Sequence, residues 1–210
     1  SAADALDAGD AEDDVFTYTV TDENGATATA TITITVTGIN DTPVAQNDVG
    51  VIEEDATLTV ANGDNANETD DSGSTYNATG EHSGDVINTS SSTHQDSDAD
   101  ASASLSVSQI KKDGGSNSAV SSGSSYDSSG TSVTGTYGTL TIGADGSYKY
   151  VADQAAADAL DLNDTATDTF VYTLSDGTAT TTANIVITVL GINDTPVSYT
   201  HLTLPTTVIV

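Results

Sequence analysis

The sequence predicts an all-β protein in which two sheets pack face to face as a sandwich, and three observations support this prediction. Apolar residues alternate with Thr over residues 16–20 and 28–37, the period-2 pattern of strands with one buried face. Short segments of this kind recur along the chain, separated by Gly- and Asp-rich turns. Only 36% of the residues are hydrophobic, and helical periodicity is weak. Many short strands around a thin core are typical of a β-sandwich.

Three hairpins are the clearest elements. Residues 16–20 and 28–36 flank the turn sequence Asp-Glu-Asn-Gly, in which Gly supplies a positive φ. In the second hairpin, Ser-Asp-Gly-Thr at 175–178 favours a tight type I′ turn. The third turns through Gly-Ala-Asp-Gly at 143–146, and residues 153–160 favour one or two helical turns. The remaining candidate strands are 49–52, 57–60, 85–87 and 105–110.

An internal repeat organises the chain. Gly-Ile-Asn-Asp-Thr-Pro-Val at residues 38–44 recurs identically at 191–197, and Asp-Ala-Leu-Asp at 4–7 recurs at 158–161. The spacing between the two copies shortens by one residue somewhere within 22–38. This difference predicts that the second copy has a shorter hairpin loop.

The repeat divides the chain into three parts. Residues 1–44 are interpreted as the C-terminal part of a preceding repeat, and residues 45–197 as one complete repeat. Ser-, Gly- and Asp-rich stretches at 62–84 and 111–132 are interpreted as surface insertions in that repeat, mobile or ordered by ions. Residues 198–210 contain no acidic residue and resemble a translated sequencing adapter, so they are interpreted as an artefact. The alternative for this tail is a divergent linker.

The charge of the chain excludes several classes of partner. The 210 residues include 32 Asp and Glu but only 3 Lys and Arg, for a formal net charge of −29. Nucleic acid and anionic membrane surfaces both need basic residues, so neither is an expected partner. No apolar run is long enough for direct membrane insertion, and the chain has no Cys for disulfides or thiolate metal sites. Calcium is the natural counter-charge for carboxylates, although an acidic surface can also serve solubility alone.

No catalytic motif supports an enzyme. The three His are His82, His94 and His201, and the sequence contains neither a nucleophile elbow nor a zinc-binding His motif. We therefore expect a protein that is not an enzyme.

The order of motifs in the second half resembles a VCBS repeat. It runs Gly-Thr-Leu-Thr-Ile at 138–142, Ala-Asp-Gly-Ser-Tyr at 144–148, Asp-Thr-Phe-Val-Tyr-Thr-Leu-Ser-Asp-Gly at 168–177, then a Thr-rich strand that ends in Gly-Ile-Asn-Asp-Thr-Pro-Val. These repeats are related to the cadherin-like domains of large RTX-type bacterial adhesins. The resemblance implies an immunoglobulin/cadherin-like β-sandwich repeat in tandem, type I secretion and Ca2+, and no catalytic activity.

The candidate metal ligands lie first where the two repeats join. Asn40 and Asp41 close one repeat, Asp48 opens the next, and Glu53 and Glu54 follow its first candidate strand. This arrangement is similar to that of cadherins, in which a linker Asn-Asp is followed by an acidic residue after the first strand. Calcium takes six to eight oxygen ligands, so several segments must converge on it. We expect Asp41, Glu53 and Glu54 to meet at one Ca2+, the alternative being that Asn-Asp-Thr-Pro is only a turn.

A second candidate group lies in the loop before residues 105–110. Asp96, Asp98 and Asp100 alternate along this loop, which suits one hard cation, although a solvated acidic loop would have the same sequence. The Gly and the distal Glu of an EF-hand are missing. Asp22 and Asp176 are interpreted as turn residues.

These observations predict a structural spacer repeat of a secreted, calcium-stiffened adhesin at a bacterial cell surface. Its expected partners are neighbouring repeats of the same chain, with surface glycans or other cells as the ligands of the parent adhesin. The alternative is a module that itself binds carbohydrate or a cell-surface ligand. Exposed aromatic residues usually mark sugar sites, and the two Ser-rich stretches contain only Tyr76 and Tyr126.

Overall fold

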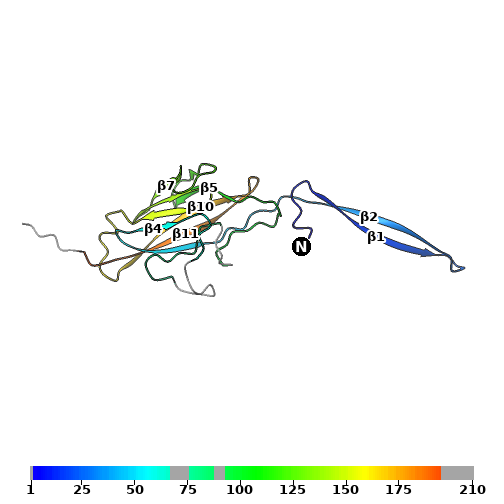
Figure 1. Cartoon of the computed structure of the whole chain (residues 1–210), viewed down its shortest axis with the longest axis horizontal. Helices are drawn as coiled ribbons and strands as arrows, with labels where there is room; N and C mark the ends of the chain where they lie inside the picture. The colour runs from blue at the N-terminus through cyan, green and yellow to red at the C-terminus, as the bar shows by residue number, and fades with distance from the viewer. Residues whose placement is uncertain (1, 67–75, 88–92, 195–210) are drawn as a thin grey trace, which may run out of the picture.

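A computed structural model describes residues 2–66, 76–87 and 93–194, and within them all regular structure is β (Figure 1). The strands are β1 (Ala11–Thr21), β2 (Thr27–Thr37), β3 (Asp48–Glu53), β4 (Thr57–Val60), β5 (Ser106–Lys112), β6 (Ser118–Ala119), β7 (Thr131–Thr134), β8 (Thr139–Ile142), β9 (Tyr148–Val151), β10 (Thr165–Ser175) and β11 (Thr180–Leu190). The prediction of an all-β fold is confirmed. The described residues contain no helix long and apolar enough to cross a membrane.

Two sheets form the sandwich, and a separate hairpin projects from one end of it (Figure 1). One sheet has the order β3-β11-β10-β5-β6 and the other the order β4-β9-β8-β7. All pairs in these sheets are antiparallel except β3 with β11, which is parallel. The projecting hairpin is β1 paired with β2.

The core forms because alternate residues of each long strand point between the sheets. In β10, Phe170, Tyr172 and Leu174 are fully buried, while the residues between them are half-buried. Tyr148 and Tyr150 of β9 face them from the opposite sheet and are also fully buried. Aromatic side chains of this size each bury a large apolar area, and Val, Ile and Leu side chains of both sheets complete the core.

The Ser-rich stretch at 111–132 needs a correction. It includes the end of β5, the whole of β6 and the start of β7, so it is part of both sheets and not only a surface insertion. Val120 is part of the buried core, and Ser124 is also buried. Ser and Gly have weak strand propensity, so the sequence pattern does not indicate these short edge strands. The other stretch, 62–84, lies partly outside the described residues.

Two local predictions were wrong and one was confirmed. Residues 85–87 are buried but lie in a bend and turn. Residues 153–160 do form turns of the helical kind, because the backbone N–H groups of Ala157 and Asp158 donate to the Gln154 carbonyl. The loop between β10 and β11 spans residues 176–179, and only Gly177 in it has a positive φ. A type I′ turn requires two such residues, so the loop is of another type. Asp176 closes it instead, because its Oδ1 accepts hydrogen bonds from the backbone N–H groups of Thr178 and Ala179, both at 2.6 Å.

The two long hairpins have the same register. Phe16 lies opposite Ile32 in the first, and Phe170 lies opposite Ile185 in the second. The one-residue difference falls in the connecting loop, as predicted, because Thr21 pairs with Thr27 while Ser175 pairs with Thr180. The boundary between repeats at residue 45 stays a prediction, and the tail at 198–210 lies outside the described residues.

Candidate metal-binding joint

The eight predicted metal ligands lie in three separate places. Asn40, Asp41, Asp98 and Asp100 lie where the projecting hairpin meets the sandwich, a region we call the joint. Asp48 and Asp96 are buried inside the sandwich. Glu53 and Glu54 lie at the end of β3, on the far side of the sandwich from the joint. Each group has a different environment and is described in turn.

The linker after β2 is held against two loops of the sandwich. The Asn40 side-chain amide donates to Asp176 Oδ2 at 3.0 Å, in the β10–β11 loop. The backbone N–H of Asp41 donates to Asp100 Oδ2 at 2.9 Å. Val44 then forms a short antiparallel bridge with Ser97. The Asn-Asp segment is therefore more than an isolated turn, because both residues contact the adjoining sandwich.

The acidic loop of the joint carries carboxylate oxygens that are buried but unpartnered. Asp98 Oδ1 accepts a hydrogen bond from the backbone N–H of Asp100 at 2.9 Å. Asp98 Oδ2 and Asp100 Oδ1 are both buried and have no hydrogen-bond partner. An unsatisfied buried carboxylate oxygen costs free energy, and a water molecule or a cation bound beside these two atoms would remove that cost.

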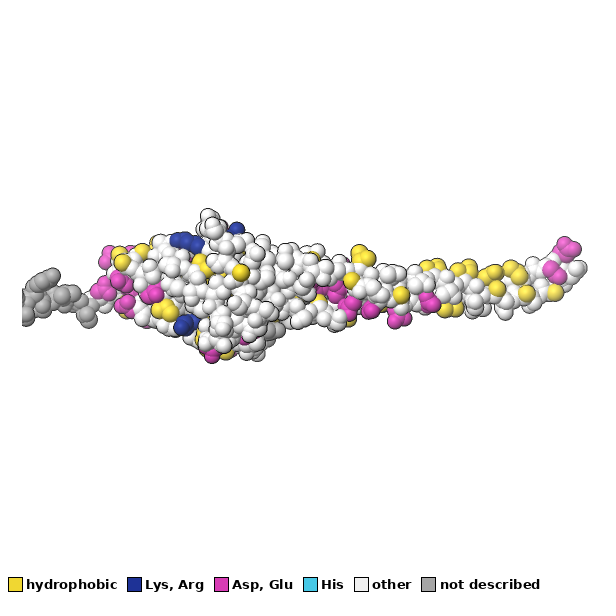
Figure 2. All heavy atoms as spheres, turned by 90° about the horizontal axis from the view of Figure 1, so that it is seen from above, with side chains coloured by type: hydrophobic (Ala, Val, Ile, Leu, Met, Phe, Trp, Pro, Cys, Tyr) yellow, Lys and Arg dark blue, Asp and Glu magenta, His cyan; other side chains and the backbone are white. Residues whose placement is uncertain are grey.

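Two further acidic residues join this region, and sequence reasoning had not assigned either to it. Asp7 accepts hydrogen bonds from the backbone N–H and the hydroxyl of Ser102, and the hydroxyl bond is the main cause that lowers the pKa of Asp7. The Asn40 amide likewise lowers the pKa of Asp176. A cavity of about 270 Å³ lies among these side chains and is lined by Asp7, Asn40, Asp100, Ser102 and Asp176. Figure 2 shows acidic side chains gathered where the hairpin meets the sandwich.

Glu54 lies at the opposite end, so the predicted meeting of Asp41, Glu53 and Glu54 is wrong. Its Oε1 accepts a hydrogen bond from the backbone N–H of Ile192 at 2.6 Å, just after β11. β3 runs parallel to β11 and away from the joint, and its six residues at roughly 3.3 Å each span most of the sandwich. Glu54 Oε2 is nevertheless buried without a partner, like the unpartnered oxygens of the joint.

Asp48 and Asp96 both lie in the interior of the sandwich. Asp48 is fully buried, and its Oδ1 accepts a hydrogen bond from the Ser83 hydroxyl at 3.0 Å. Asp96 accepts a hydrogen bond from the backbone N–H of Gln46 at 2.7 Å. Burial raises the pKa of Asp48 well above its usual value, and the neighbouring Asp96 charge raises it further. Burial also raises the pKa of Asp96, to about 7.

The side-chain oxygens at the joint are of the type that Ca2+ prefers as ligands. They are carboxylate and amide oxygens, and Ca2+ commonly completes its six to eight ligands with backbone carbonyls and water. Across residues 2–66, 76–87 and 93–194, no group of three His, Asp or Glu side chains is placed so that it could hold a metal ion by itself. A cation at the joint would therefore depend on neutral oxygen ligands as well as on Asp98 and Asp100.

Comparison with known proteins supports the fold. Residues 4–35, which include β1 and most of β2, match the family model of bacterial Ig domains. No curated protein matches the sequence. A solved endo-fucoidan hydrolase from glycoside hydrolase family 107 aligns with a TM-score of 0.34 and 15% identity over 90% of this chain and 20% of its own. The chain thus spans about a fifth of that structure.

The strand arrangement is that of an immunoglobulin-like β-sandwich, and the similarity to bacterial Ig domains lies in the segment that contains the projecting hairpin. Domains of this family are typically non-catalytic and serve as structural or binding modules of extracellular and surface proteins. The match does not reach the finer level of VCBS or cadherin-like repeats of RTX adhesins.

Proposed function

We propose that the chain is a structural spacer of a secreted bacterial adhesin, of the VCBS or cadherin-like type, in which Ca2+ stiffens the joints between tandem repeats. The observation that carries this proposal is the joint itself. One linker is tied to two loops of the adjoining sandwich through Asn40 and Asp41, and it lies beside two buried carboxylate oxygens that lack partners.

The mechanism is electrostatic. Asp7, Asp98, Asp100 and Asp176 bring four carboxylates to a junction between segments that are far apart in sequence. Without a cation their mutual repulsion favours separation of the linker from the loops. A bound Ca2+ would neutralise the carboxylates and connect the segments through shared oxygen ligands. The joint would then hold one orientation.

The setting of an extracellular spacer fits this mechanism. Extracellular calcium modules have dissociation constants of about 10⁻⁴–10⁻³ M. A joint of that affinity would be loose in a calcium-poor cytosol and stiff outside the cell. An array of such sandwiches would extend a binding region away from the cell surface, with neighbouring repeats as its main partners.

The test measures extension of the molecule. Small-angle scattering of the chain with millimolar Ca2+ and with chelator should show a larger maximum dimension and a narrower size distribution in Ca2+. Asp100→Asn should abolish most of this difference, because it removes a carboxylate of the joint.

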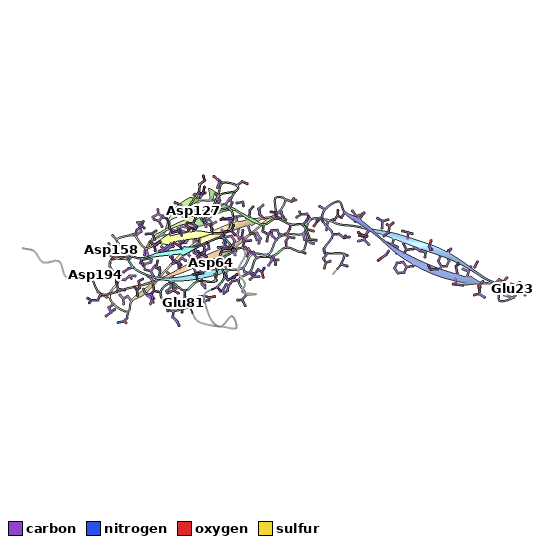
Figure 3. All side chains as sticks on the ribbon, viewed as in Figure 1. Glu23, Asp64, Glu81, Asp127, Asp158 and Asp194 are labelled. Atoms are coloured by element: carbon purple, nitrogen blue, oxygen red, sulfur yellow. The ribbon has the colours of Figure 1, made fainter. Side chains whose placement is uncertain are left out.

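Asp158→Asn is the matched control, since it makes the same change at an exposed position at the far end of the sandwich (Figure 3). The control should respond to Ca2+ like the unaltered chain. Equal dimensions with and without Ca2+ in the unaltered chain would overturn the proposal.

A further inference from the structure

The interior of the sandwich contains more hydrogen-bond acceptors than donors at one place. The Tyr172 hydroxyl lies 3.0 Å from both carboxylate oxygens of Asp96 and 2.8 Å from the backbone carbonyl oxygen of Gln46. A phenol carries a single proton, so it can donate to only one of these three oxygens at a time. Asp96 Oδ1 also accepts the Gln46 backbone N–H at 2.7 Å, but Asp96 Oδ2 and the Gln46 carbonyl compete for the single phenol proton, and an unserved acceptor is costly inside the core.

Two more buried oxygens in this region have no partner. Asp48 Oδ2 and the Tyr148 hydroxyl are both fully buried, and neither makes a hydrogen bond. They come from opposite sheets, because Asp48 begins β3 and Tyr148 begins β9. The Tyr148 hydroxyl also lies close to β3, because it would be 3.6 Å from a Cβ atom placed on Gly50, two residues after Asp48 in that strand.

Three buried carboxylates belong to this region. Asp48 and Asp85 are fully buried, and Asp96 is almost fully buried. Asp85 is held by hydrogen bonds from the backbone N–H groups of Gly63 and Ile87. The buried residues that the structure describes include no Lys or Arg, so a bound cation would offset the repulsion between these carboxylates.

A route to the outside exists beside Asp96. A cavity of about 440 Å³ is lined by Asn62, Gln95, Asp96, Ser104, Leu105 and Asp145. Most of these side chains are polar, so hydrated ions can enter the cavity. The cavity therefore brings solvent-accessible space up to Asp96.

We propose that the sandwich interior binds one Ca2+ between Asp48 and Asp96, at a site separate from the joint. Two carboxylates balance the charge of a divalent cation. The Ser83 and Tyr148 hydroxyls and the Gln46 carbonyl supply the neutral oxygens that Ca2+ accepts as further ligands. The cation would connect β3 to β9.

Terbium luminescence tests this site in the full chain. Tb3+ occupies Ca2+ sites and emits when a nearby excited aromatic ring transfers energy to it, and this chain has Tyr but no Trp. We expect Tyr-sensitised emission that Ca2+ displaces. Asp48→Asn should weaken Tb3+ binding at this site by at least about tenfold, because even the loss of an outer-shell partner typically costs that much metal affinity. Asp100→Asn at the joint should leave the emission in place.

The outcomes separate this proposal from that for the joint. The interior site is refuted if the emission survives Asp48→Asn but is lost in Asp100→Asn, or if the unaltered chain gives no sensitised emission. Circular dichroism confirms that each variant folds. Should Asp48→Asn not fold, Tyr148→Phe removes one proposed ligand and keeps the ring. It should weaken Tb3+ binding several-fold, and unchanged binding would overturn the proposal. Scattering of Asp48→Asn should still show the Ca2+-dependent extension that depends on the joint.

Discussion

The β1–β2 and β10–β11 hairpins have matching sequence and register but opposite environments. Phe170 and Tyr172 are fully buried, whereas Phe16 and Tyr18 at the same positions of the first hairpin are 54% and 45% exposed. β10 pairs with β5 and β11 pairs with β3, while β1 and β2 pair only with each other in the part of the chain that the structure describes. Figure 2 shows the resulting hydrophobic side chains along the first hairpin. Local sequence therefore determines strand and register, and neighbouring strands determine burial.

The largest expected effect comes from removing the shared Phe. Phe170→Ala should lower the free energy of unfolding by about 3–5 kcal/mol, because it leaves a cavity in a closed core. Phe16→Ala should change it by less than about 0.5 kcal/mol, because the side chain is already half in water. Urea unfolding of both variants measures the difference. Similar losses would mean that the first hairpin is buried in solution.

The second comparison concerns the Asp that occupies the same position in both hairpins. The Asp168 carboxylate accepts hydrogen bonds from the backbone N–H groups of residues 136–138, at 2.6, 2.9 and 3.1 Å, and from the Tyr150 hydroxyl at 2.8 Å. Asp168→Asn replaces one acceptor oxygen with a donor and should destabilise the sandwich by about 1–3 kcal/mol. Asp14→Asn, at the same position of the first hairpin, is exposed and should be almost neutral. Thermal unfolding distinguishes the two, and equal melting temperatures would contradict the role of Asp168.

The third comparison uses the two loop residues Asp22 and Asp176. Each accepts backbone hydrogen bonds within its own loop, but only Asp176 also contacts Asn40 in the described residues. Free Ca2+ at tenfold its dissociation constant should stabilise the chain by about 1.4 kcal/mol per site. Asp176→Asn should reduce this gain, and Asp22→Asn should preserve it. Melting temperatures with Ca2+ and with chelator provide the measurement. An identical Ca2+ response in both variants would exclude Asp176 from the site.

The smallest expected effect concerns the segments that come after the two hairpins. After Val44 the chain continues with Ala-Gln-Asn-Asp, but after Val197 it continues with a tail that has no acidic residue. Deleting residues 198–210 should leave the melting temperature unchanged within error. A clear decrease would show that the tail is a genuine part of the protein and that its interpretation as an artefact is wrong.

The sequence predicted the features that depend on local pattern. Alternation identified the long strands, and the recurring Asn-Asp-Thr-Pro segment located the joint. It did not reveal that Asp7 and Asp176 also lie there, because loops distant in the chain come together only after the sheets form. Nor could periodicity show that β3 pairs parallel to β11, and this pairing is what places Glu54 far from Asp41.

The parallel pairing of β3 with β11 also determines how the sandwich responds to tension. Six consecutive residue pairs join these strands, from Asp48 opposite Ile185 to Glu53 opposite Leu190. The chain enters at the start of β3, beside the joint, and leaves from the end of β11 on the far side (Figure 1). A force along the chain would therefore slide the two strands past each other lengthwise. All their hydrogen bonds would then carry the load together and would have to break at once. Forced unfolding is governed by the unfolding rate, so this shear arrangement should make each sandwich resist pulling more strongly than its equilibrium stability alone implies.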